Sequence, residues 1–182
     1  MLVPTTVTSR LELVSISPSF LEALLAGRPF IAEGIARLSL PRGWPDEHDE
    51  RFLHVRLQDM RDDPDTQRWL VRAMDIRRDP LRPMIGDVGF HGPPKDGALE
   101  LGYTVMPQYR RQGYAREAAL GMMDWAAREH AINRFLVSIS PDNEPSLALA
   151  EKMGFQRIGE QMDPEDGLEY VFELNYTPEG ER

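Results

Sequence analysis

The 182-residue chain contains no cysteine. This absence excludes disulfide bonds, thiolate zinc sites and cysteine nucleophiles, and it agrees with a cytoplasmic location. No apolar run approaches the roughly 18 residues that a membrane helix needs. The first ten residues, MLVPTTVTSR, also lack a basic segment followed by an apolar one. We therefore expect no membrane partner and no secretory signal.

Basic residues are scarce relative to acidic ones. The 21 Lys and Arg against 30 Asp and Glu give a formal net charge of −9. Nucleic-acid surfaces normally carry a basic face, so a nucleic-acid-binding module is disfavoured. The 41% hydrophobic and 28% charged residues are typical of a folded domain and argue against extended disorder.

The hydrophobic pattern predicts a mixed α/β (α+β) fold in one domain over 1–182. We expect helices over 17–26, 30–40, 46–62, 113–130 and 143–153, and strands over 10–16, 69–74, 84–90, 98–105, 134–140, 155–161 and 168–175. Residues 1–9 are predicted to be a loose N-terminus. The expected architecture is a mixed, mostly antiparallel sheet of six to seven strands with helices on both faces.

The chemistry concentrates in residues 99–130. A strand ends near Val105, and the run Arg110-Arg111-Gln112-Gly113-Tyr114-Ala115 leads into an amphipathic helix. Free N–H groups at a helix start attract anions, and glycine lets a phosphate approach the backbone. Arg110, Arg111 and Arg116 add positive charge. The pattern indicates a local anion site, with a solvated basic helix cap as the alternative; neither a P-loop nor a G-x-G-x-x-G motif is present.

This pattern resembles motif A of the GNAT superfamily of N-acetyltransferases, Q/R-x-x-G-x-G/A. Residues 138–155 are similar to motif B of the family, with Asn143, Ser146 and the run Glu151-Lys152-Met153-Gly154-Phe155. The segment 85–90 resembles the strand that precedes motif A. The resemblance covers about 84–175, strongest toward the branch that acetylates ribosomal-protein N-termini, and leaves 10–83 as the acceptor-side region.

The resemblance implies a GNAT-like fold and acetyl-CoA as co-substrate, with 84–175 as the acetyl-CoA-binding core. Backbone groups of Arg111, Gln112, Gly113, Tyr114 and Ala115, with Arg110 and Arg116 nearby, would hold the pyrophosphate. The main chain of Tyr103, Thr104 and Val105 would pair with the pantetheine arm. Asn143 and Ser146 would lie near the thioester, although Asn143 also suits a helix N-cap.

Acyl transfer requires the acceptor ammonium to lose a proton. Glu100, on the strand leading to motif A, is the candidate general base; a solvent-facing or salt-bridged carboxylate is the alternative, and Tyr103 and His91 are lesser candidates. A backbone N–H near Val105 would stabilise the oxyanion. Many family members carry a tyrosine as general acid where this chain has Ala150. Ser146, one turn earlier, could take that role or could be an ordinary first-turn residue.

The leading functional interpretation is an N-acetyltransferase that moves an acetyl group from acetyl-CoA to a primary amine by direct attack on the thioester. The acceptor could be a peptide N-terminus or a small-molecule amine. The alternative is a non-catalytic acyl-CoA-binding or regulatory domain on the same fold. We expect no metal, because the histidines are scattered without H-E-x-x-H spacing. Family habit and apolar closing strands suggest a homodimer, and Trp44 would line the acceptor pocket or anchor its loop.

Overall fold

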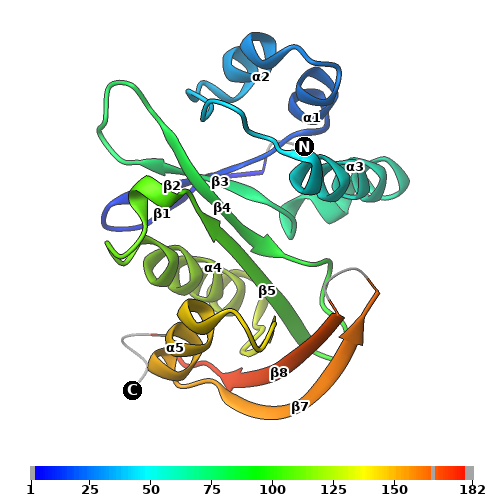
Figure 1. Ribbon diagram of the computed structural model, residues 1–182, viewed down its shortest axis with the longest axis vertical. Coiled ribbons are helices and arrows are strands. Elements are labelled where there is room, and N and C mark those ends of the chain that lie inside the picture. Colours follow the sequence, from blue (N-terminus) through cyan, green and yellow to red (C-terminus); the bar gives the residue numbers. More distant parts are fainter. Residues whose placement is uncertain (1–2, 165–166, 179–182) are drawn as a thin grey trace.

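The computed structural model describes residues 3–164 and 167–178 and contains one mixed sheet flanked by helices (Figure 1). Within these residues the sheet has eight strands in the order β1-β2-β3-β4-β5-β6-β8-β7. The strands are β1 (Thr6–Val7), β2 (Leu11–Ser15), β3 (Arg72–Ile76), β4 (Met84–Phe90), β5 (Ala98–Val105), β6 (Arg134–Ile139), β7 (Gln156–Asp163) and β8 (Gly167–Asn175). The helices are α1 (Pro18–Leu25), α2 (Pro29–Ala36), α3 (Glu47–Asp62), α4 (Tyr114–His130) and α5 (Glu144–Met153), with short 3-10 turns at Pro64–Arg68 and Pro107–Tyr109.

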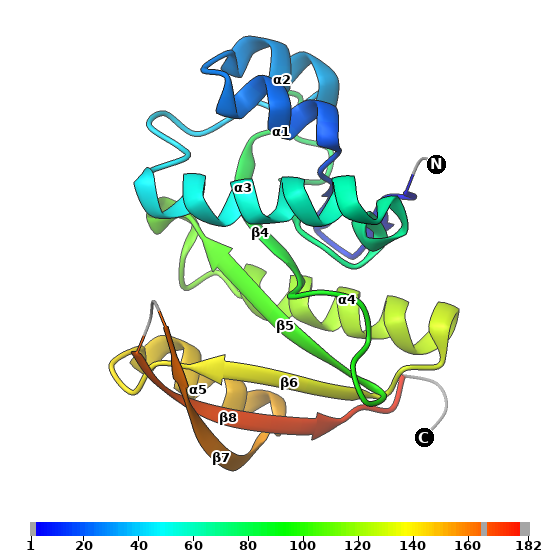
Figure 2. The same ribbon diagram turned by 90° about the vertical axis from the view of Figure 1, so that its right-hand side faces the viewer.

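The central feature is the single parallel pair, β5 and β6. They pair only at their beginnings, from Ala98 opposite Arg134 to Glu100 opposite Leu136. All other neighbouring strands in the described sheet are antiparallel. Figure 2 shows β5 and β6 meeting at one end and diverging toward their carboxyl ends. The divergence opens a wedge in the sheet directly before the 110–116 segment.

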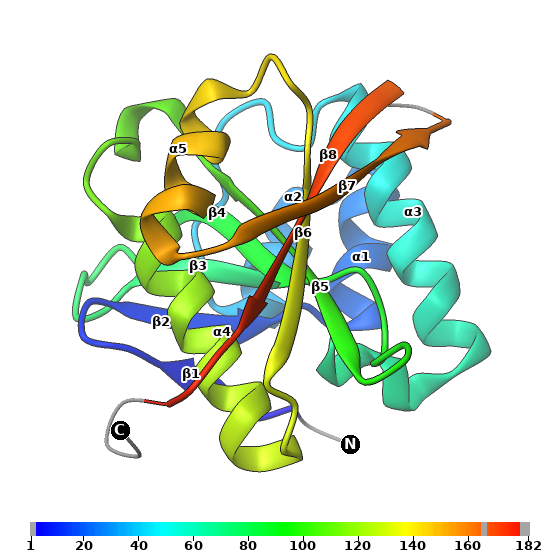
Figure 3. The same cartoon turned by 90° about the horizontal axis from the view of Figure 1, so that it is seen from below.

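Helices cover both faces of the sheet, as expected. Helices α1 to α3 form one core with residues such as Phe20, Leu53 and Leu57. Helix α4 buries a small-residue stripe that includes Ala118, Ala119 and Met122 against the other face. Figure 3 shows α4 and α5 on one side of the sheet and α1 and α3 on the other. No helix in the described part of the chain is long and apolar enough to cross a membrane.

The strand count exceeds the expected six to seven because part of the segment predicted to be loose forms β1. Thr6 pairs with Leu13 and Val7 with Glu12. This short edge strand has no alternating pattern of its own, so its order comes from contacts with distant residues. The strand expected over 69–74 instead begins at Arg72, because Trp69 ends a 3-10 turn.

Candidate active site

The 110–116 segment folds as a turn with exposed amide groups. Arg111 and Gly113 both adopt left-handed backbone, with φ of 63° and 84°. Gly113 is the N-cap of α4, and no side chain in the described part of the chain caps this helix start. The first-turn N–H groups therefore have no intrahelical partner, and the alternating backbone forms a concave anion-binding surface. The sequence correctly places the helix start here.

The arginines of this segment differ in placement. The Nε of Arg110 donates a 2.8 Å hydrogen bond to the carbonyl of Val105. Arg110 therefore ties the end of β5 to the turn, a contact the sequence did not suggest. Arg111 and Arg116 are exposed, so their guanidinium groups can reach a bound phosphate.

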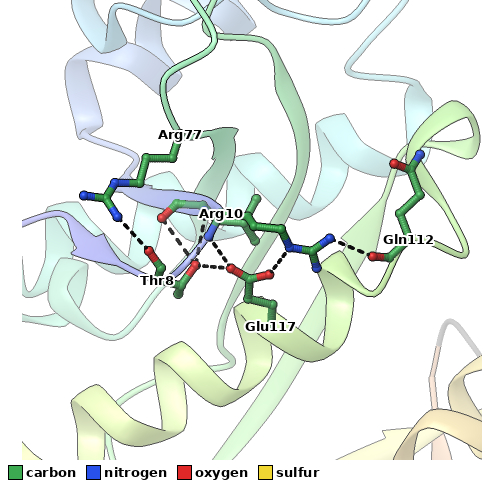
Figure 4. A network of polar contacts seen from close by, with 6 residues as sticks. Thr8, Arg10, Arg77, Gln112 and Glu117 are labelled. Carbon is green, nitrogen blue, oxygen red and sulfur yellow. Dashed lines mark hydrogen bonds and ion pairs between the residues drawn. The ribbon is translucent and has the colours of Figure 1, made fainter.

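A fourth arginine, which the sequence reasoning missed, lies at the same helix start. Arg10 donates from Nε to Glu117 Oε2 at 2.6 Å and from Nη1 to the carbonyl of Gln112 at 3.0 Å (Figure 4). Its guanidinium also lies 4.6 Å from the ring centroid of Tyr114. Thr8 donates a 2.7 Å bond to the other oxygen of Glu117. This network, Thr8–Arg10–Glu117, fixes the turn against the N-terminal strands.

The network also controls charge at the helix start. Burial opposes ionisation of Glu117, but hydrogen bonds from Thr8 and Arg10 outweigh it and hold the pKa of this carboxyl below its ordinary value. The carboxylate is paired with Arg10 rather than facing the turn. The positive field of Arg111, Arg116 and the α4 dipole is thereby preserved.

The wedge between β5 and β6 exposes backbone groups of β5. The carbonyl of Glu100 and the N–H of Met106 both bond on the β4 side. Because ladder bonds alternate along a strand, the backbone groups of Leu101, Tyr103 and Val105 point toward β6. The β5–β6 pairing stops at the Glu100–Leu136 pair, so the backbone groups of Tyr103 and Val105, beyond it, face the wedge. An extended ligand could add there as a strand.

Helix α5 closes one side of the wedge. Asn143 is its N-cap, with Oδ1 accepting the N–H of Ser146 at 3.3 Å, as the capping interpretation predicted. The hydroxyls of Ser146 and Tyr103 hydrogen-bond to each other, and burial raises the pKa of Tyr103 while that bond opposes the shift. Ala150 is buried and has no hydroxyl, so this position cannot supply the general acid that a tyrosine supplies in many family members.

Glu100 lies at the closed end of the wedge, in a partly buried position with its side chain 31% exposed. The Oγ of Ser138 donates a 2.6 Å hydrogen bond to Glu100 Oε1. His91 Nδ1 lies 3.6 Å from the same oxygen. The other ring nitrogen of His91 covers Gly102, where an added Cβ would approach it to 2.9 Å. His91 therefore lies between Glu100 and the face of β5 above Gly102.

A cavity of about 190 Å³ opens on this same face, between α3 and strands β4 and β5. Register pairs Asp87 with Thr104 and Gly89 with Gly102, and these four residues line its floor. The opposite wall is formed by Trp44, His48, Asp49, Phe52 and Leu53. Of the residues that the sequence analysis named, Tyr103, Thr104, His91 and Trp44 line this cavity.

Asp87 is a carboxylate the sequence reasoning did not single out. Burial raises its pKa to about 7, and the nearby charge of Asp49 adds to the shift. Burial also raises the pKa of Asp49, whose Oδ2 accepts the N–H of Asp46 in the α3 capping box. Perturbed carboxyls in a cavity are typical of functional sites.

A larger, open groove of about 1,420 Å³ runs along the outer side of α4. It includes Gly113 and Arg116 at one end and His130 at the other. Glu100, Asp87 and the wedge residues do not line it. We therefore do not assign the reaction to this groove despite its size, although the groove reaches the anion-binding turn at Gly113.

The Acetyltransferase (GNAT) domain family matches residues 10–156. This span covers most of the chain, so the protein belongs to the GNAT acetyltransferase family. The fold and the suggested resemblance are thereby confirmed.

Individual relatives agree at lower coverage. An N-acetyltransferase 9-like protein of Nematostella vectensis is 35% identical over 99 residues, covering 53% of this chain and 48% of the relative. The chain spans about half the length of the curated relatives it matches.

Two solved structures share the fold. RimL, a ribosomal L7/L12 alpha-N-protein acetyltransferase in complex with coenzyme A, has a TM-score of 0.62 at 21% identity, covering 97% of this chain and 98% of that one. The microcin C7 self-immunity acetyltransferase MccE, in complex with acetyl-CoA and AMP, has a TM-score of 0.61 at 15% identity, covering 92% and 93%.

Proposed function

We propose that the protein is an acetyl-CoA-dependent N-acetyltransferase acting on a primary amine. The observation that carries this proposal is continuity. An anion-binding turn at Gly113 leads into a wedge of free β5 backbone groups, and the wedge borders a carboxylate-lined cavity. A CoA ester needs the first two features, and an ammonium acceptor needs the third.

The donor would bind along the wedge. Backbone N–H groups of 111–116, with Arg111 and Arg116, would hold the pyrophosphate at the α4 start. Tyr103 and Val105 would bond the pantetheine amides as an added strand, with Thr104 between them and Asn143 at the far side. Arg110 leaves the Val105 N–H available because it binds only the carbonyl.

The chemistry requires a base, an oxyanion donor and an acid. Glu100 is the proposed base and takes a proton from the acceptor ammonium, with His91 between them as the relay. The neutral amine then forms a bond to the thioester carbon, and a β5 backbone N–H in the wedge stabilises the oxyanion. Collapse breaks the C–S bond. The attacking nitrogen still carries one proton more than the amide needs, and Ser146, hydrogen-bonded to Tyr103, would pass that proton on to the leaving thiolate.

An amine panel followed by CoA release tests this function. Acetyl-CoA is supplied with peptide N-termini, polyamines and small amines, and calorimetry measures CoA binding in parallel. Turnover of any amine supports the enzyme. Tight CoA binding without turnover of any amine would instead support the alternative, a non-catalytic acyl-CoA-binding domain.

We also propose a cytoplasmic homodimer. Exposed apolar side chains on the edge strand β7, Ile158 and Met162, together with Leu168 on β8, support self-association through the closing strands. Light scattering at high micromolar concentration should give twice the 20.8 kDa chain mass. A monomer mass would refute the dimer without touching the enzymatic proposal.

A further inference from the structure

The cavity over β4 and β5 combines two carboxylates with an aromatic wall. Asp49 and Asp87 approach from opposite sides, α3 and β4. Among the described residues, no hydrogen bond or ion pair to the Asp87 side chain is present. Two carboxylates that share one cavity repel each other, and a bound cation would relieve that repulsion.

The position of Asp87 relates it to the wedge. Asp87 pairs with Thr104, so it lies at the level of Tyr103 to Val105, beside the proposed thioester position. Glu100 lies four residues before Thr104 on β5, roughly 13 Å away at the rise of a strand. Gly89 and Gly102 lie between them, and the His91 ring lies over Gly102. An acceptor entering here meets Asp87 at the depth of the thioester.

Aromatic residues on the opposite wall of the cavity favour an acceptor that carries an apolar group. Trp44 and Phe52 line the cavity, and Arg56 stacks over the Phe52 ring at 5.1 Å from its centroid. Aromatic faces attract cations and pack apolar groups. The cavity volume of about 190 Å³ exceeds the roughly 150 Å³ of an engineered protein cavity that binds benzene. The cavity therefore has room for roughly one aromatic ring.

We propose that Asp87 binds the acceptor's ammonium, and that the cavity takes primary amines carrying a compact apolar group and no carboxylate on the carbon next to the nitrogen. This inference rests on the proposed function, whose acceptor class it narrows. A carboxylate on that carbon would lie against Asp87 and Asp49 and be repelled. Free α-amino acids are thereby excluded, and their amides are not.

Three matched probes separate these classes: phenethylamine, phenylalaninamide and phenylalanine. They are assayed at about pH 8, and His48 and His91 also line the cavity. Asp49 from α3 remains as the second acidic group, and Arg56 lies on the His91 side. We expect CoA release with the first two probes at comparable kcat/KM, and at least 100-fold lower kcat/KM with phenylalanine. Equal use of phenylalanine would overturn the proposal.

Asp87→Asn tests the residue itself. Asparagine keeps the shape of the aspartate side chain and removes its charge. The KM for phenethylamine should therefore rise at least tenfold while kcat changes less than threefold. Asp62→Asn is the matched control, because Asp62 is an exposed carboxylate at the far end of α3. An unchanged KM in Asp87→Asn would overturn the assignment.

Binding without turnover distinguishes this inference from the function it rests on. Calorimetry of phenethylamine with CoA-saturated protein should show binding to wild type and Asp62→Asn, and at least tenfold weaker binding to Asp87→Asn. Absence of acetyl transfer with intact, Asp87-dependent amine binding would refute the enzyme and support the cation site. Acetyl transfer together with amine binding that does not depend on Asp87 would support the enzyme and refute the cation site.

Discussion

The raised pKa of Asp87 has a consequence for stability that can be measured without any ligand. Burial, with the charge of Asp49 adding to it, moves this pKa from its ordinary 3.8 to about 7 in the folded chain. The native state therefore binds more protons than the unfolded state between these two values. By linkage, folding stability must fall as the pH rises through that window.

The size of the effect follows from the shift. About three units at 1.36 kcal/mol each give roughly 4 kcal/mol of lost stability above pH 7, and at most about 1 kcal/mol near pH 4.5. Asp87→Asn removes the charge at every pH and keeps the side-chain shape. The variant should therefore be more stable than wild type at about pH 8.5 by an amount approaching that figure, and nearly equal to it near pH 4.5.

Urea unfolding at these two pH values measures the difference. Asp62→Asn, which removes an exposed carboxylate from α3, should show no comparable pH-dependent gain. A stability difference between Asp87→Asn and wild type that stays constant with pH would refute the reasoning, because it would mean that Asp87 titrates alike in both states. Destabilisation at pH 8.5 would show that the carboxylate has a stabilising partner.

Three further predictions concern the donor site and the base. Gly113→Leu should weaken CoA binding at least tenfold, about 1.4 kcal/mol, because a φ of 84° strains any side chain there and the new group would crowd the phosphate; unchanged affinity in calorimetry would contradict this. Glu100→Gln should lower kcat/KM by about 100-fold or more and leave the CoA affinity unchanged. His91→Ala should lower kcat/KM to a similar extent. Near-wild-type turnover in either variant would mean that the substituted residue does not lie on the proton path. Arg10→Ala should raise the CoA dissociation constant severalfold because it leaves Glu117 unpaired at the helix start, and adding Glu117→Gln should recover part of the loss; no recovery would mean that Arg10 acts on the turn's shape rather than its charge.

Local sequence signals accounted for most of the fold. The amphipathic helix expected after Gly113 is α4, which buries Ala118, Ala119 and Met122. The N-cap expected at Asn143 starts α5. These features depend on neighbours within one or two turns, which the sequence places directly. The wedge was not readable in this way, since it depends on how far β5 and β6 stay paired.

The features that sequence missed are long-range. Arg10 reaches Glu117 across 107 positions, and nothing near Arg10 marks it as different from the other arginines. Asp87 became a candidate only when α3 brought Asp49 over β4. Its chemistry comes from burial and from a like charge, and neither is a property of its local sequence.

Glu100 and Asp87 lie on the same face of the sheet, and their different surroundings suit one to catalysis and the other to recognition of the acceptor. Glu100 is held by Ser138 and lies next to His91, so its charge has hydrogen-bonded support. Asp87 has no such hydrogen bond within residues 3–164 and 167–178, and burial raises its pKa. The hydrogen-bonded carboxylate of Glu100 suits proton transfer through the neighbouring imidazole of His91. The unsupported one suits a cation that supplies the missing charge. An acceptor ammonium bound at Asp87 would thus stabilise the site it enters, and its apolar group would displace water from the aromatic wall beside the thioester.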